Sequence, residues 1–292
     1  MNISGFTFVR NAEIFDYPVL ESLRSLLPLC DEVIVAVGNS DDRTLQMIHD
    51  LRDPRIAIHE TVWDDSLRSG GRILAVQTDI ALARCSGDWC IYLQADEVLH
   101  EDDYPLIRQE IKNAIAHPEI DALLFAYHHF YGSYDYIGGG RQWYRQEIRS
   151  FRNSGNVLSW GDAQGFRKTE HGESVKLRAR RTKARVYHYG WVKHPRIQQR
   201  KQQYFHKLWH SDEWMKENIP AVDEFEYKCF DLQKFTGSHP AVMHERIEHS
   251  REWTQHFDYN RKIPKPLRHK ILDAFERVTG KRIGEYKNFI EV

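Results

Sequence analysis

Short apolar runs along the chain alternate with longer stretches in which apolar side chains recur at helical spacing. The runs predict strands at Ile3 to Val9, Glu32 to Val37, Arg55 to His59, Trp89 to Leu93 and Ala122 to Tyr127. The stretches between them predict helices at Asp16 to Leu29, Thr44 to Leu51, Arg72 to Arg84 and Pro105 to Ala116. Strands that alternate with helices are typical of a mostly parallel sheet flanked by helices. The first half therefore predicts an α/β fold.

The pattern changes after Tyr131, where glycines, aromatics and short strands follow one another. The clearest of these strands are Glu147 to Arg152 and Lys176 to Tyr189. Beyond Pro195 the spacing turns helical, with helices predicted at Gln198 to Trp209, Val222 to Phe235 and Val242 to Trp253. We therefore expect one α/β domain over residues 1–193 and a helical C-terminal extension over residues 194–292 that packs on it.

Composition narrows the class of protein. The formal net charge of the 292 residues is -1, which gives no basic field for binding nucleic acid. Cys30, Cys85, Cys90 and Cys229 show no CxxC spacing, which argues for reduced thiols in a cytoplasmic protein and against a disulfide or zinc framework. No stretch approaches the length of a membrane span, so we expect a soluble protein, and a peripheral contact with a membrane-borne substrate stays open.

The stretch Asp88 to His100 combines a buried strand with acidic residues at its carboxyl end. Ligands of open α/β sheets bind at that edge, and the carboxylates of Asp96 and Glu97 are suitable oxygen ligands for a divalent cation. An exposed strand end followed by a helix cap is the plainer interpretation. The chain contains neither GxGxxG after its first strand nor GxxxxGK[ST], so the sequence supports neither a dinucleotide fold nor a P-loop.

Four segments, in order and spacing, resemble glycosyltransferase family 2, whose members are inverting enzymes with a GT-A fold. They read FTFVRNA, VIVAVGNSDDRT, GGRILAVQTDIALARCSGDW and QADE, and the resemblance spans about residues 1 to 190. Two positions depart from the family pattern. Gln94 stands where the family usually has the first Asp of its metal-binding motif, and Gly38 stands where it often has an acidic residue near the base.

The resemblance implies a GT-A-like single-sheet fold that binds a nucleotide-sugar. It implies transfer of a sugar to a glycan or glycoconjugate hydroxyl, with a UDP-sugar as the favoured donor. It also implies Mn²⁺ or Mg²⁺ as cofactor and a role in polysaccharide biosynthesis. Asp96 and His188 are the expected metal ligands; Glu97 is either a further ligand or an acid at a helix N-terminus. A packed core histidine is the alternative for His188.

The donor is expected to lie across the ends of the first two strands. Arg10, Asn11, Asn39, Asp41 and Asp42 would frame the base and ribose, although an ordinary helix cap explains the same turn. Three further residues complete this prediction: Arg72 and Lys193 near the diphosphate, and Gln94 near a ribose hydroxyl or a metal-bound water.

An inverting transfer needs a carboxylate that takes the proton of the acceptor hydroxyl. Asp162 lies in a glycine-flanked loop and is the favoured base, with Glu147 in the preceding strand as its rival. Two other functions stay open. Gln94 in place of an acid motivates a degenerate sugar-nucleotide-binding module without turnover. A nucleotidyltransferase shares the layered fold but normally opens with a Gly-rich phosphate loop, which FTFVRNAE lacks.

Overall fold

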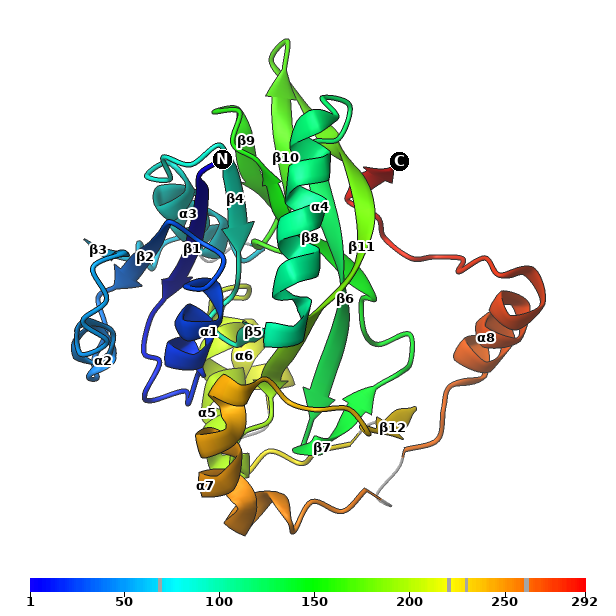
Figure 1. Cartoon of the computed structure of the whole chain (residues 1–292). Coiled ribbons are helices and arrows are strands. Elements are labelled where there is room, and N and C mark those ends of the chain that lie inside the picture. The colour runs from blue at the N-terminus through cyan, green and yellow to red at the C-terminus, as the bar shows by residue number, and fades with distance from the viewer. Residues whose placement is uncertain (68–69, 220–221, 229–230, 260–262) are drawn as a thin grey trace.

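A curved sheet runs through the computed structural model and carries helices on both faces (Figure 1). The structure describes residues 1–67, 70–219, 222–228, 231–259 and 263–292. The main strands lie in the order β3-β2-β1-β4-β8-β6-β11-β10-β9. Their bounds are β1 Ile3–Val9, β2 Glu32–Gly38, β3 Ile56–Thr61, β4 Trp89–Tyr92, β6 Ala122–Tyr131, β8 Gln146–Arg152, β9 Val157–Trp160, β10 Gly165–Glu170 and β11 Glu173–Trp191. This mixed α/β architecture confirms the predicted fold class.

Parallel pairing holds in one half of the sheet. β3, β2, β1 and β4 are parallel neighbours, as is the pair β6 and β11. β8 lies antiparallel between β4 and β6, and β9 and β10 continue as an antiparallel hairpin beside β11. The carboxyl ends of the parallel strands β1, β2 and β4 therefore meet at one edge of the sheet. In the second half, β8 runs in the opposite direction to β4.

Alternating residues of each strand face the two helical layers, as the two-residue period of a strand requires. Val33, Val35 and Val37 of β2 join the core beneath α1 (Val19–Leu26) and α4 (Tyr104–Ala116). Ile34 and Ala36 join the opposite core beneath α3 (Arg72–Leu82). Both faces of the strand are covered, which explains why its sequence is a continuous apolar run.

The helices of the first half lie where the pattern predicts them, with ends that differ by a few residues. α2 (Thr44–His49) completes this set. Five short elements went unpredicted: β5 Glu97–Leu99, β7 Ser133–Gly138, α6 Asp212–Asn218, β12 Leu232–Lys234 and β13 Phe289–Glu291. The hairpin β9–β10 was also missed.

The segment after residue 193 combines helices with strands of the main sheet. α5 (Pro195–Lys207) and α7 (His244–Thr254) confirm two predicted helices, and α8 (Leu267–Thr279) adds a third. The helix predicted at Val222 to Phe235 is wrong: residues 222–228 are irregular, and β12 pairs with β7. Polar and charged residues there supply too few apolar contacts for a helix. β13 returns the chain to β11; the domain boundary near residue 193 stays a prediction.

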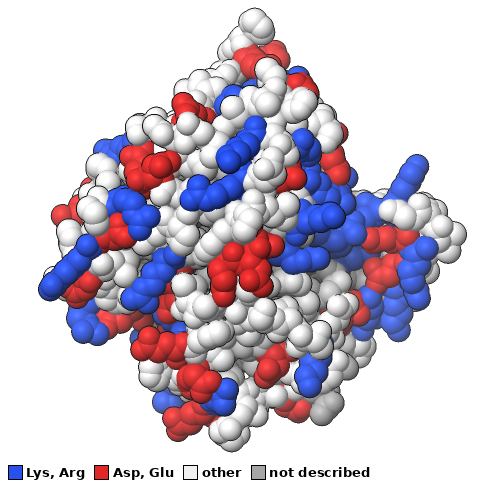
Figure 2. Space-filling view, in the orientation of Figure 1, with Lys and Arg blue, Asp and Glu red and all other residues white. Residues whose placement is uncertain are grey.

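Lys, Arg, Asp and Glu are intermixed over the visible face of the molecule, as the net charge of -1 suggests (Figure 2). Of the four cysteines, Cys30, Cys85 and Cys90 are free thiols, whereas Cys229 lies outside the described residues. No helix in the described part of the chain is long and apolar enough to cross a membrane.

Candidate active site

Asp96 lies in the turn between β4 and β5, and β11 holds this turn in place. Its carbonyl oxygen accepts a hydrogen bond from the Tyr189 N–H at 2.8 Å. The buried carboxylate places Oδ2 3.2 Å from Lys201 Nζ and Oδ1 3.8 Å from His188 Nε2. Burial by itself would raise the pKa of Asp96, but the positive charge around it, that of Lys201 above all, outweighs burial and lowers the pKa to about 2. The carboxylate is therefore ionised at neutral pH.

A hydrogen-bonded chain of two histidines and a carbonyl lies behind Asp96. His129 Nε2 is 2.8 Å from the Tyr144 carbonyl oxygen, and His129 Nδ1 is 2.9 Å from His188 Nδ1. A carbonyl only accepts, so the Nε2 of His129 carries the proton. Burial lowers the pKa of both imidazoles, which keeps them neutral. His129 Nδ1 therefore accepts from His188 Nδ1, and His188 Nε2 keeps a free lone pair on the side of Asp96.

Gly190 keeps the space between these two side chains open. A Cβ at position 190 would lie 2.6 Å from Asp96 Oδ2 and 2.6 Å from His188 Nε2. Real Cβ atoms do not approach so closely, so any other residue would displace the carboxylate or the imidazole. The glycine thus allows an oxygen and a nitrogen ligand to converge on one point.

Glu97 is the first residue of β5 and not an acid at a helix N-terminus, so that expectation is wrong; its carboxylate is held in a buried ion pair. Its Oε2 accepts from Arg149 Nε at 2.8 Å, and its Oε1 accepts from Arg149 at 2.9 Å and from the Tyr127 hydroxyl at 2.8 Å. Both side chains of this ion pair are almost fully buried, with exposed fractions of 0% for Glu97 and 1% for Arg149. Both carboxylate oxygens are occupied, which removes Glu97 from the ligands we propose below.

Two lysines bring positive charge to Asp96. Lys201 of α5 also donates to the Gly190 carbonyl at 2.9 Å. Lys193 is fully buried and donates to the Asp16 carbonyl at 2.7 Å, and burial lowers its pKa to about 7. Both ammonium groups lie over the ring of Tyr17, at 4.8 and 5.0 Å from its centroid. The sequence interpretation included Lys193 but missed Lys201, which has no local motif around it.

The ends of β1 and β2 meet as the donor-site prediction requires. Arg10 Nε donates to the Asn39 carbonyl at 2.9 Å. The Asn11 N–H donates to Ser40 Oγ at 3.0 Å, and the Asp41 N–H donates to Asn11 Oδ1 at 2.8 Å. Asn11 adopts a left-handed conformation with φ 57°, which suits its place in this tight junction. The turn and the first strand thus form one rigid unit.

The remaining predicted donor residues differ in their surroundings. Asp42 accepts from the N–H groups of Ile14 and Thr44 at 2.8 and 2.9 Å, which ties the segment after β1 to the start of α2. Arg72 is exposed at the start of α3. Gln94 lies two residues before Asp96, and its backbone N–H donates to Glu97 Oε2 at 3.1 Å.

Trp63 explains the glycine at position 38. A Cβ on Gly38 would lie 2.3 Å from Trp63 Nε1, so the indole occupies the space that a side chain at position 38 would need. Trp63 is buried, the guanidinium of Arg10 lies 5.5 Å from its ring centroid, and its Nε1 has no hydrogen-bond partner among the described residues. The edge of the sheet at the ends of β1 and β2 therefore contains an indole N–H without a hydrogen-bond acceptor among the described residues, close to Arg10.

The two candidate bases lie in the same electrostatic neighbourhood. Glu147 of β8 is buried, and this burial, reinforced by the charges of Glu97, Asp162 and Glu285, raises its pKa to about 7 despite the opposing charge of Arg149. Burial also raises the pKa of Asp162, which lies in the turn between β9 and β10.

Glu147 also lines a cavity of about 410 Å³. Trp143, Tyr144 and residues 283–286 form part of its wall. A carboxylate in such a cavity can meet a substrate that enters from solvent.

A model of the family described as glycosyl transferase family 2 matches residues 17–172, which is more than half of the chain. The chain belongs to glycosyl transferase family 2. The matched region of this family 2 chain contains Asp96, Glu147 and Asp162, whereas His188 and the two lysines lie beyond it. No curated protein matches the chain.

Among solved structures, the chain is similar to Staphylococcus aureus TarS in complex with UDP, with 22% identity over 43% of this chain and 35% of that chain and a TM-score of 0.33. It is also similar to glucosyl-3-phosphoglycerate synthase from Mycobacterium tuberculosis in complex with Mn²⁺, UDP and phosphoglyceric acid, with 21% identity over 43% of each chain and a TM-score of 0.30. The mannosyltransferase PcManGT from Pyrobaculum calidifontis, in complex with GDP-Man and Mn²⁺, matches with 19% identity over 42% of this chain and 34% of that chain and a TM-score of 0.30. This chain thus spans less than half the length of each of the three.

Replacing Arg149 tests the structural role of Glu97. Arg149→Met should lower the free energy of unfolding by about 3–5 kcal/mol, because it leaves a buried carboxylate without its partner. Adding Glu97→Gln should recover part of the loss. Urea denaturation measures both, with Arg180→Met as control, since Arg180 pairs with Glu110 nearer the surface and should cost at most about 1 kcal/mol. A loss of that small size for Arg149→Met would contradict the prediction.

The proton positions in the histidine chain are directly measurable. In the metal-free protein, ¹⁵N NMR of the imidazoles should show His188 protonated on Nδ1 and unprotonated on Nε2. His129→Phe removes the acceptor and should let His188 populate both tautomers. His128→Phe is the matched control, because its ring lies against Tyr187 and Phe235, away from His188. An unchanged His188 spectrum in His129→Phe would show that His129 does not set the tautomer.

Proposed function

We propose that the protein transfers a sugar from a nucleoside diphosphate donor, UDP-sugar first of all, to a hydroxyl of a glycan or glycoconjugate, with inversion and with a divalent metal. Family membership supports transfer chemistry. The observation that carries the proposal is the convergence of the Asp96 carboxylate and the unprotonated Nε2 of His188 over Gly190. An oxygen and an imidazole nitrogen are a donor set that suits Mn²⁺.

The residues present fit such a metal. Within the described residues no group of three or more His, Cys, Asp or Glu side chains is placed to hold an ion, so Asp96 and His188 would supply two ligands. The remaining positions would be left to oxygens of the donor diphosphate and to water, as is usual where a metal acts on phosphate. When bound, the metal would neutralise charge that develops on the departing diphosphate.

The protein's own cations would add to this effect. Lys201 pairs with Asp96, and the charge of Lys193 acts on the same carboxylate, so both would attract the donor phosphates if the nucleotide occupies the β1 and β2 ends. Arg10, Asn11, Asn39 and Asp41 would hold the base and ribose there. The indole N–H of Trp63 has no acceptor among the described residues, and a ligand bound at this edge would supply one.

On the acceptor side, we propose Glu147 as the base, with Asp162 as the alternative that the sequence favoured. The hydroxyl oxygen would bond to the anomeric carbon as the bond from that carbon to the diphosphate oxygen breaks, and the hydroxyl proton would pass to Glu147. A base works best when its pKa lies near the working pH, and the pKa of Glu147 is raised to about 7. Its cavity also offers Trp143 and Tyr144 as flat surfaces for a sugar ring.

The other functions remain distinguishable from this one. A degenerate module would bind the nucleotide-sugar without turnover, and a nucleotidyltransferase would release diphosphate from a nucleoside triphosphate. Incubation with UDP-sugars and Mn²⁺ should release UDP if the proposal is right. We also propose the cytoplasm as the compartment and polysaccharide biosynthesis as the process, which the free thiols of Cys30, Cys85 and Cys90 support only as far as the compartment.

Calorimetric titration with UDP tests the metal site. Mn²⁺ should tighten UDP binding by the wild type, and Asp96→Asn and His188→Phe should each reduce the Mn²⁺-dependent gain by about tenfold or more. Binding without metal should change less. Asp88→Asn, at the other end of β4 with an exposed side chain, is the matched control. Equal losses with and without Mn²⁺ would show that both residues act structurally.

The pH dependence of turnover tests the base. Glu147 accepts a proton only when ionised, so kcat/KM should rise with pH up to about 7, the pKa of Glu147, and then level off. Glu147→Gln should lower turnover by about two to four orders of magnitude and remove this rise, while UDP binding persists. If Asp162→Asn is inactive and Glu147→Gln keeps near-normal turnover, the role belongs to Asp162.

A further inference from the structure

Helix α8 projects from the body of the protein and stands apart from the sheet (Figure 1). Its large apolar side chains face solvent. Leu267, Ile271, Phe275 and Val278 are 72%, 61%, 39% and 87% exposed. At 100° per residue these four positions fall within an arc of about 80°, so they form one continuous apolar stripe. A helix of a soluble protein normally turns such a stripe toward the core, and the exposed stripe therefore requires a partner.

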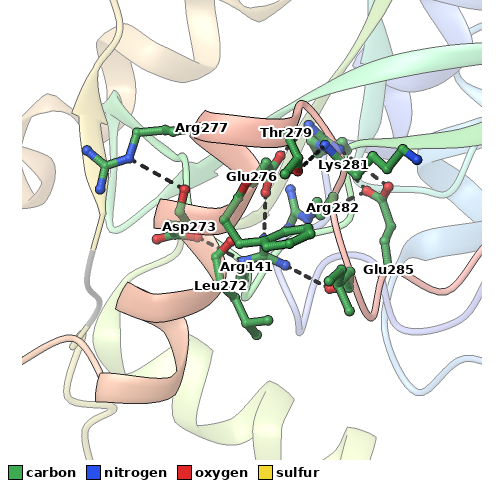
Figure 3. A network of polar contacts seen from close by, with 12 residues as sticks. Arg141, Leu272, Asp273, Glu276, Arg277, Thr279, Lys281, Arg282 and Glu285 are labelled. Atoms are coloured by element: carbon green, nitrogen blue, oxygen red, sulfur yellow. Dashed lines mark hydrogen bonds and ion pairs between the residues drawn. The ribbon is translucent and has the colours of Figure 1, made fainter.

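The acidic residues of α8 are on the opposite side and hold the helix to the protein. Arg141 donates to Asp273 at 2.8 Å and to Glu276 at 2.7 Å, and Arg145 pairs with Glu276 at 3.0 Å. Figure 3 shows Arg141 directed at both carboxylates, with Arg282 and Glu285 in the same network. The stripe is thus turned outward by ion pairs rather than left exposed by a loose helix.

Basic residues border the stripe on both sides. Arg268 follows one edge, and Lys270 and Arg277 follow the other when the helix is projected at 100° per residue. All three are exposed, and within the described residues none forms an ion pair with a carboxylate. Basic side chains are visible on the lobe formed by α8 in Figure 2. The outward face therefore combines an apolar centre with cationic borders, while Asp273 and Glu276 are partly buried in the network on the opposite side of the helix.

We propose that the outward face of α8 docks on an anionic lipid membrane. An apolar stripe inserts into the boundary between headgroups and acyl chains, and bordering cations meet anionic headgroups, which is the arrangement of interfacial helices. A second copy of the chain fits less well. Two-fold pairing would bring the three cations close to those of the second copy. A stable interface buries about 800 Å² per partner, and the face of a helix only about 20 Å long buries far less.

Docking would also place a cavity at the membrane. The cavity of about 410 Å³ that contains Glu147 is lined by Arg268 and Leu272 of α8. The acceptor side of the protein would then lie beside the lipid surface. The docking itself does not depend on the proposed transfer reaction, since it rests on α8 alone.

Sedimentation of the full-length protein with vesicles tests the proposal. The wild type should bind vesicles of phosphatidylcholine with phosphatidylglycerol much more tightly than vesicles of phosphatidylcholine alone, and added salt should weaken the binding. The double variant Ile271→Gln/Val278→Gln should reduce the partition coefficient about tenfold or more. Lys270→Gln and Arg277→Gln should each reduce it about fivefold on anionic vesicles only.

Val62→Gln is the matched control, because Val62 is 81% exposed and directly follows β3, which lies on the other side of the molecule from α8 (Figure 1), so this change should leave binding unchanged. Absence of wild-type binding, or equal loss in Val62→Gln, would overturn the proposal. Sedimentation equilibrium without lipid provides the competing outcome: a dimer that Ile271→Gln/Val278→Gln dissociates would make the stripe a protein interface and would likewise overturn membrane docking. Thermal melting of each variant shows whether a loss of binding reflects unfolding.

Discussion

The site depends on a buried ion pair that takes no part in the proposed chemistry. Glu97 and Arg149 are bound through two hydrogen bonds in the buried interior, where an unpaired charge is strongly unfavourable. Arg149 also donates to the Gln164 carbonyl at 2.8 Å, which ties the β9–β10 turn to the same point. The ion pair fixes the side chain of Glu97 and with it the backbone at this point. The preceding residue, Asp96, is therefore held with its carboxylate directed toward His188.

The same interaction shows why the fold was easier to predict than the site. Strands and helices of the first half depend on local periodicity, and β1 and β2 were found almost to the residue. The distinction between Asp96 and Glu97 depends on Arg149, more than fifty residues away, and on the backbone of β8 that carries it. Adjacent carboxylates look alike in a sequence; only their partners separate a ligand from a structural acid.

Other parts of the site depend on similar long-range contacts. The prediction for His188 used its place near a strand end, whereas the contact with His129 depends on the register of β6 against β11, which pairs the two residues directly. Lys201 reaches Asp96 only because α5 packs back across the sheet edge after β11. Gly38 departs from the family pattern because the indole of Trp63, which lies just after β3, fills the space that a side chain at position 38 would need. None of these contacts leaves a local signal.

The charge around Asp96 gives meaning to the other departure from the family pattern. A second acid at position 94 would add negative charge at the place where a diphosphate must bind, and a divalent metal would have to compensate both. Gln94 leaves one carboxylate, and this carboxylate already has Lys201 on one oxygen while its other oxygen faces the lone pair of His188. Lys193 adds a cation that burial has brought close to neutrality, so a nearby diphosphate would favour its protonated form. Two lysines of the protein thus supply part of the positive charge that a diphosphate leaving group needs. The proposed metal then has one acid to neutralise instead of two.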